Sequence, residues 1–502
     1  MQASPIYGVP NDILQEIFVQ SLSDNRWRIG LSPLDTPVLL THVCKRWRTL
    51  ALGFPKVWQS LRWDTHVGEL NAHKQLDIVA AAAGRAKSAP RSLQVIIRQN
   101  TPSSVEAQKA IFKVLPDIPR QLLNPPAPSL TRLVLKGVPI AQIHAIPNGL
   151  FLSLARLVLH LDGTDLETFP WSTKGPVTAF SDTPALRGVG MGSSFPFNFL
   201  KAQFVSGRVL LPWEQLTHVL DFAPALDTSP MFDYLNKCSR LRYLFVTLHE
   251  GDVGEEGVSH WRHKAGDVRV LENLESVSLY YWNSRAGDIG YPAILDLFEF
   301  PNLKALRLDG ATLNFQQSEQ WTEPLSNRFI SRIGSLEHLT YLSLCPISVH
   351  PDTFRRIILA TPRVKILDGF IYENYENFFE LLIWNPDRQM LPELEVLILE
   401  LDNTLADDEG EGEPIPAQSF DVFLESRMKA SSPFRRVVVF SSREHHLDEG
   451  VPFVQVALKY VALGLCFEPT LVKENRSRKV NHLWVERDPE LQDWPELCET
   501  HS

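Results

Sequence analysis

Few residues of this 502-residue chain have the types and spacing that support chemistry. Gly188, Gly190 and Gly192 alternate in the segment GVGMG, and closely spaced glycines let a backbone approach a phosphate. The segment lacks the third glycine of the dinucleotide-binding spacing and any pattern of a following helix. Its alternation is also that of a strand, which favours a structural role over a phosphate site.

The cysteines and histidines do not form a recognisable ligand set. The five cysteines are far apart and contain no C-x-x-C pair: Cys44, Cys238, Cys345, Cys466 and Cys498. His260 and His263, and the pair His445 and His446, lack cysteine or carboxylate neighbours at zinc-site spacing. The chain contains no G-x-S-x-G, H-E-x-x-H or P-loop motif. We therefore expect no metal, no cofactor and no catalytic residue, and hence a protein that is not an enzyme.

Charge and hydropathy exclude two classes of partner. Lys and Arg number 49 against 59 Asp and Glu, a formal net charge of −10, so no general attraction to nucleic acid or anionic lipid is expected. No run approaches the roughly 18 apolar residues of a membrane span. The N-terminal sequence lacks the pattern of a signal peptide. We expect a cytoplasmic or nuclear protein that binds neither membrane nor nucleic acid.

Leucine makes up about 14% of the chain and recurs in the pattern L-x-x-L-x-L. Clear copies begin at Leu130, Leu154, Leu241, Leu274, Leu303, Leu339 and Leu394. In such a repeat a short strand points alternate leucines into a shared core, and a helix returns to the next strand. The pattern is typical of an irregular leucine-rich-repeat solenoid. It predicts an α/β fold with parallel strands on a concave face and helices on a convex face.

The residues between these leucines point to the opposite face of the strands. Aromatic and arginine side chains are enriched at protein-binding sites, so we expect a target to contact the middle of this face. The candidate target-binding residues are Tyr243, Phe245, Tyr280, Arg307 and Tyr341. The alternative is that these aromatic side chains support neighbouring strands of the sheet.

The first sixty residues predict three short helices. One begins near Pro10 and carries an apolar stripe that includes Ile13, Leu14 and Ile17. A second begins at Thr36 and continues through Trp47 to Ala51, and a third lies near Val57–Leu61. Three short helices bury little surface, so the unit is expected to need a partner.

These helices resemble an F-box. The resemblance rests on VPNDILQEIF and PVLLTHVCKRWRTLALGFPKVWQSL, in which Val43, Cys44, Trp47 and Arg48 match the V-C-x-x-W-R core. The chain is similar to F-box-like proteins common in mushroom-forming fungi. An F-box docks a substrate receptor onto the Skp adaptor of a cullin-RING ubiquitin ligase. The resemblance implies these adaptor-binding residues: Val9, Pro10, Ile13, Leu14, Ile17, Val43, Cys44, Trp47, Leu50 and Trp58.

The chain is thus divided into an F-box-like domain (1–64), a connecting helix (65–92), a leucine-rich-repeat array (93–445) and a C-terminal cap (446–502). The resemblance implies the substrate-recognition subunit of a Skp–cullin–F-box ligase, with an unknown protein as substrate. The mechanism would be proximity rather than catalysis by this chain. The alternative is a repeat-based scaffold that binds proteins outside any ligase.

Overall fold

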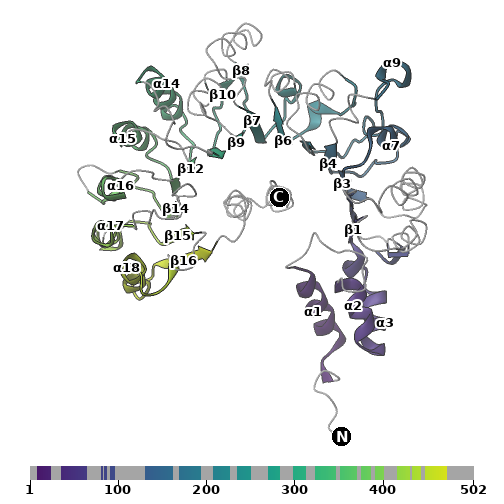
Figure 1. The fold of residues 1–502 in the computed structure, drawn as a ribbon, viewed down its shortest axis with the longest axis horizontal. Coiled ribbons are helices and arrows are strands. Elements are labelled where there is room, and N and C mark those ends of the chain that lie inside the picture. The colour runs from purple at the N-terminus through teal and green to yellow at the C-terminus, as the bar shows by residue number, and fades with distance from the viewer. Residues whose placement is uncertain are drawn as a thin grey trace, which may run out of the picture. The chain divides into compact units, whose positions relative to one another are not determined.

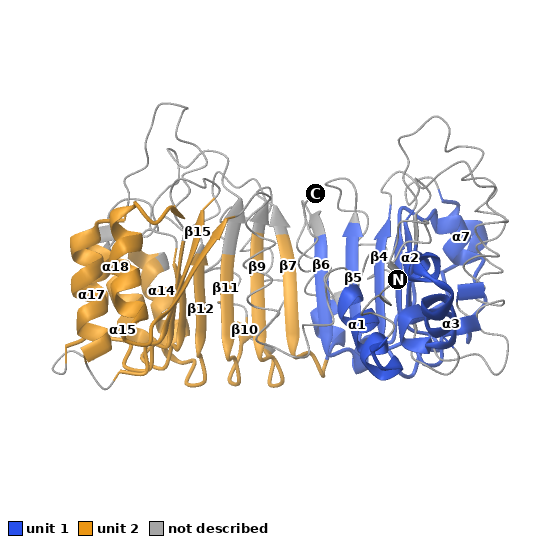
Figure 2. Cartoon of the chain, turned by 90° about the horizontal axis from the view of Figure 1, so that it is seen from below, with its two compact units in different colours: residues 1–223, 233–238 blue, residues 224–232, 239–502 orange. Residues whose placement is uncertain are grey.

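The computed structural model describes most of the repeated region and part of the N-terminal region. The described residues are 8–23, 36–64, 81–82, 84–86, 91–96, 130–161, 169–193, 207–225, 234–249, 269–282, 295, 298–311, 323–345, 351–369, 375–385, 390–400, 415–429, 432–441 and 447–471. They fall into two compact units, residues 1–223 with 233–238 and residues 224–232 with 239–502 (Figure 2). Most of the predicted connecting helix, the histidine pairs and the residues after 471 lie outside the described part of the chain.

The first unit begins with short helices. They are α1 (Asn11–Ser23), α2 (Thr36–Val43), α3 (Lys45–Gly53) and the 3₁₀ turn η2 (Pro55–Trp58). The prediction of one continuous helix from Thr36 to Ala51 is wrong, because Cys44 is extended, with φ −160° and ψ 170°. Its Sγ accepts a hydrogen bond from the Trp47 N–H at 3.5 Å and so caps the start of α3.

Parallel strands follow in the first unit and neighbour one another in chain order. They are β1 (Ser60–Asp64), β2 (Arg91–Ile96), β3 (Leu130–Lys136), β4 (Arg156–Leu161), β5 (Gly188–Ser193) and β6 (His218–Ala225). Short helical turns lie between the later strands: α7 (Ile140–His144), α9 (Trp171–Lys174) and η3 (Trp213–Gln215).

The second unit alternates parallel strands with longer helices. Its strands are β7 (Tyr243–His249), β9 (Ser276–Trp282), β11 (Ala305–Ala311), β12 (Tyr341–Cys345), β13 (Ile366–Gly369), β14 (Val396–Glu400), β15 (Arg436–Ser441) and β16 (Cys466–Leu471). Its helices are α14 (Glu323–Gly334), α15 (Pro351–Ala360), α16 (Tyr375–Leu382), α17 (Ala417–Lys429) and α18 (Pro452–Val461), all along one side of the strands (Figure 1). On the same side, β8 (Arg269–Val270) and β10 (Phe298–Glu299) form a separate parallel pair.

The leucine pattern sets the strand register. In the second unit Val277, Leu306 and Leu342 are paired across β9, β11 and β12, and the pairing continues through Leu367 and Leu397. All these side chains are buried. The α/β class with parallel strands is confirmed, and six such strands lie in the first unit and eight in the second among the described residues.

A repeated hydrogen bond holds neighbouring strands at this register. The residue just before each strand offers its carbonyl oxygen to two N–H groups of the next repeat. The Arg242 oxygen accepts from Glu275 and Ser276 at 2.8 and 3.0 Å, and the Glu275 oxygen accepts from Lys304 and Ala305 at 2.8 and 3.0 Å. Every repeat from β7 to β14 makes this pair of bonds with the next, and the Arg435 oxygen of the β15 repeat accepts one, from Cys466 at 2.8 Å, so a one-residue slip would break all of them.

Three strands lack an earlier prediction, because β6 and β16 hold other residues than leucine at core positions and β1 lies where the sequence predicts a third helix near Val57–Leu61. In β6, Asp221 occupies the position that pairs with Met191, and in β16, Pro469 pairs with Val439. β1 directly follows the helical segment that the F-box pattern covers. The β15–β16 pairing also carries the strand–helix alternation past residue 446, where the sequence predicts a cap.

The contact of α17 with α18 is expected to weaken in acid. The Tyr460 hydroxyl donates to Asp421 Oδ1 at 2.6 Å, and Lys459 Nζ lies 3.0 Å from the same oxygen. The hydrogen bond from Tyr460, followed by that from Lys459, outweighs partial burial and holds the pKa of Asp421 below its ordinary 3.8. Because the folded pKa is the lower one, the stabilisation is complete above about pH 5 and lost as the pH falls below about 4. Urea unfolding should show Asp421→Asn less stable than the wild type at neutral pH; an equal difference at about pH 3 would contradict this.

Within the described part of the chain, none of the helices has both the length and the apolar character needed to cross a bilayer.

Candidate functional site

Two helices of the first unit carry apolar side chains that face solvent. Ile13 and Ile17 on α1 are 50% and 45% exposed, and Leu39 and Val43 on α2 are 48% and 54% exposed. The members of each pair are four positions apart in the sequence, so each pair lies on one face of its helix. The two helices are in contact. We call these four side chains the apolar helix surface.

A small core lies beneath this surface. Leu14 and Phe18 on α1 are fully buried, and the Phe18 ring meets Trp47 edge to face at a centroid distance of 5.0 Å. Trp58 is also buried, and its indole N–H donates to the Ala51 carbonyl oxygen at 2.7 Å. Leu14 and Trp58, which are predicted to contact an adaptor, are thus used in this conformation to pack the helices together.

Most of the other predicted adaptor-binding residues are intermediate in solvent exposure. Val9, Cys44, Trp47 and Leu50 are partly buried, and Pro10 is exposed just before α1. The exposed apolar area of this region is therefore carried chiefly by the apolar helix surface. Fully burying one isoleucine side chain contributes about 1.5–3 kcal/mol, so a partner that covers this surface gains substantial binding free energy.

Arg46 is a positioning residue that the sequence pattern does not reveal. Its guanidinium donates to the Val9 carbonyl oxygen at 2.5 Å and to Asn11 Oδ1 at 2.6 Å. These bonds join the start of α3 to the start of α1, 35 or more residues earlier in the chain. Helical periodicity does not reveal this role, because it carries no information on contacts with a distant segment.

The five candidate target-binding residues lie on one face of the second unit's strands, as their alternation predicts. They are Tyr243, Phe245, Tyr280, Arg307 and Tyr341, and each is at most 5% exposed. The expectation that they offer an accessible surface is therefore wrong for this conformation.

A row of polar side chains crosses that face. Ser278 and Arg307 are paired across β9 and β11, and Ser343 and Asp368 continue the row, whereas β7 has the apolar Phe245 at this position. The Ser343 hydroxyl donates to Asp368 Oδ2 at 2.8 Å, and both residues are buried. The last strands replace this row with an apolar cluster of Val396, Ile398, Val438 and Phe440. The row thus places polar side chains, with the Ser343–Asp368 hydrogen bond, within a buried sheet face.

The alternating glycines make room for neighbouring side chains. A Cβ on Gly190 would lie 3.1 Å from Val158 Cγ2, and a Cβ on Gly192 would lie 3.0 Å from the His160 ring. Burial, together with the charge of Lys136, lowers the pKa of His160 to about 4, so the ring is neutral at neutral pH. Val158 and His160 fill the strand face beside these glycines. The space beside these glycines is occupied by protein rather than left for a phosphate.

Comparisons with known proteins give no relative: no family model matches the chain, and no curated protein matches it. Among the described residues, no three histidine, cysteine, aspartate or glutamate side chains are grouped so that they could hold a metal ion. The apolar helix surface is therefore the site with the clearest chemistry in the described structure.

Proposed function

We propose that this chain is the substrate-recognition subunit of a Skp–cullin–F-box ubiquitin ligase. The observation that carries the proposal is the exposed pair Ile13 and Ile17 on α1, set over a core of Leu14 and Phe18. Both isoleucines belong to the segment whose sequence resembles an F-box. A helix that buries one apolar side and exposes another needs a partner, and the F-box resemblance supplies the Skp adaptor as that partner.

The rest of the chain would hold the target. Strand–helix alternation with leucines at matched register supports a leucine-rich-repeat array. Such arrays bind proteins on extended surfaces. The chain would act by proximity, holding a target near the ubiquitin-loading component, while its partners carry out the ligation. We place this activity in the cytoplasm or nucleus.

Ile17→Asp is expected to abolish capture of the Skp adaptor by the full-length chain. The substitution places a charge in the centre of the interface, where it would be desolvated without a partner. Leu152→Asp is the matched control, because Leu152 is 60% exposed in the same unit but lies outside the helices. It should capture the adaptor as the wild type does. Equal capture by Ile17→Asp would remove the proposal.

The same capture experiment separates the ligase subunit from a scaffold. A ligase subunit recovers the adaptor together with a cullin, and Ile17→Asp loses both proteins. Recovery of the adaptor without any cullin would instead favour a repeat protein that binds its partners outside a ligase.

A further inference from the structure

A second layer of elements lies beside the strands of the second unit. Next to β11 this layer changes from a pair of short strands to a helix. The two-stranded pair β8–β10 precedes this strand, and helix α14 follows it (Figure 1). Adjacent strands lie about 4.8 Å apart, whereas a helix with its side chains is about 10 Å wide. Side chains of the two kinds of element do not interlock fully at the junction. A cavity of about 330 Å³ remains there, open to solvent.

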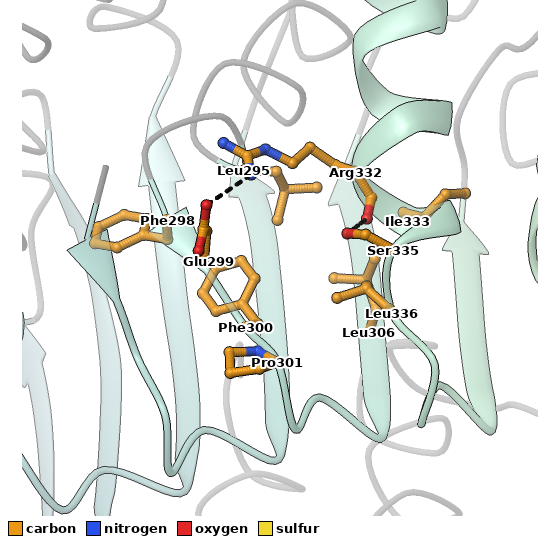
Figure 3. Close-up of a pocket in the computed structure, with 10 residues that line it drawn as sticks. All are labelled: Leu295, Phe298, Glu299, Phe300, Pro301, Leu306, Arg332, Ile333, Ser335 and Leu336. Carbon is orange, nitrogen blue, oxygen red and sulfur yellow. Dashed lines mark hydrogen bonds and ion pairs between the residues drawn. The ribbon is translucent and has the colours of Figure 1, made fainter. Parts of the chain in front are cut away.

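Apolar side chains form the inside of this cavity (Figure 3). Phe298 and Phe300 form one wall, with ring centroids 5.9 Å apart. Leu306 of β11 lies at the base, and Ile333 and Leu336 close the side toward α14. Leu306 occupies a repeat leucine position, so the cavity reaches down to the core of the array.

Two opposite charges lie at the mouth. Arg332 Nη1 and Glu299 Oε1 are 3.8 Å apart, longer than a charge-assisted hydrogen bond. A peptide group offers one N–H donor and one C=O acceptor, which complement this carboxylate and this guanidinium. A ligand with a net charge would instead meet a like charge within a few ångströms. The mouth thus favours a neutral amide next to an apolar group.

We propose that this cavity binds one bulky apolar side chain of a partner polypeptide, with the adjoining peptide group placed between Glu299 and Arg332. Its volume is near the lower end of ligand pockets, about 300–1,000 Å³, which suits a single side chain rather than a cofactor. Large apolar side chains in pockets often anchor protein interfaces. The inference rests on the proposed function only in naming the ligase target as the source of the peptide.

Binding of capped amino acids to the purified full-length chain tests the proposal. Saturation-transfer NMR should detect N-acetyl-phenylalaninamide with a dissociation constant on the order of 1 mM, and N-acetyl-alaninamide should bind at least about tenfold more weakly. N-acetyl-phenylalanine, which carries a carboxylate, should bind more weakly than the amide, and Glu299→Gln should remove that difference. Equal binding of the alanine and phenylalanine amides would overturn the proposal, as would toluene binding as tightly as the phenylalanine amide.

Ser335→Trp locates the binding. Ser335 is an exposed residue at the mouth, and an indole there should cover the opening and raise the dissociation constant at least about tenfold. Leu463→Trp is the control, because Leu463 is exposed after α18, and it should leave the constant unchanged. Unchanged binding to Ser335→Trp would overturn the proposed site. Adaptor capture by the same preparations is a separate readout. If the chain fails to capture the adaptor but still binds the phenylalanine amide, the proposed ligase role is contradicted and the proposed pocket is retained.

Discussion

Replacing Arg427 with leucine is expected to lower the free energy of unfolding of the second unit by about 3–5 kcal/mol. Arg427 is fully buried on α17, and its guanidinium donates three hydrogen bonds. Nε reaches the Leu382 oxygen at 2.9 Å, Nη1 the Leu391 oxygen at 2.9 Å and Nη2 the Met390 oxygen at 2.8 Å. Leucine would leave all three carbonyl groups in the interior without these donors.

The same guanidinium joins α17 to two other segments of the chain. The Leu382 oxygen belongs to the end of α16, and the two other oxygens belong to a turn in which Leu391 has a left-handed φ of 46°. A non-glycine residue there is strained, so neighbouring contacts must hold it in place. Desolvation lowers the pKa of Arg427 to about 10, which still leaves the side chain charged at neutral pH. The Trp384 ring, 5.4 Å from the guanidinium carbon, provides a further favourable contact with the cation.

Hydrogen exchange along residues 375–429 measures this effect against a matched control. Arg435 lies in the same unit, is 71% exposed and pairs with Glu395 at 2.6 Å. Arg435→Leu removes the same charge but should cost no more than about 1 kcal/mol, because exposed ion pairs contribute little. The loss of unfolding free energy in Arg427→Lys should lie between those of the two leucine variants. Lysine keeps the charge but cannot donate to three carbonyl oxygens in a fixed geometry. Equal protection in Arg427→Leu and Arg435→Leu would contradict the assigned role.

Nothing local in the sequence distinguishes Arg427 from an arginine on a wet helix face. The segment AQSFDVFLESRMK is amphipathic, and near the C-terminus of a helix arginine normally interacts with solvent and the helix dipole. Its burial results from the loop at residues 390–391, whose path no periodicity encodes. By contrast, strands such as β11 and β12 are predictable because leucines two residues apart bury one side of a strand wherever the neighbours provide a core.

The sequence predicts which apolar residues α1 carries, but it does not predict which of them face solvent. The apolar stripe of α1 contains Ile13, Leu14, Ile17 and Phe18 and is wider than one side of a helix needs for a core. Which edge is buried depends on α2, α3 and η2, which cover Leu14 and Phe18 and leave the isoleucines exposed. The strand face that holds Tyr243 shows the same limit: alternation gives the face of a side chain but not what shields it.

Leu14→Asp and Ile13→Asp, at adjacent positions, are expected to lose adaptor capture for opposite reasons. Leu14 is fully buried, so an aspartate there places an unpaired charge in a core formed by three short helices. That cost exceeds about 3 kcal/mol, and so small a unit has little stability to spare. Ile13 is half exposed, so its substitution should change the stability by no more than about 0.5 kcal/mol while placing a charge in the docking interface.

Hydrogen exchange read together with adaptor capture separates the two mechanisms. Leu14→Asp should lose protection throughout α1, α2 and α3, whereas Ile13→Asp should retain wild-type protection there, and neither should alter the second unit. A folded Leu14→Asp variant would contradict the packing of α1. Normal adaptor capture by a folded Ile13→Asp variant would contradict the docking role of the exposed stripe. Because one carboxylate is added at neighbouring positions, net charge is the same in both variants, and only the direction of the side chain decides between unfolding and a failed interface.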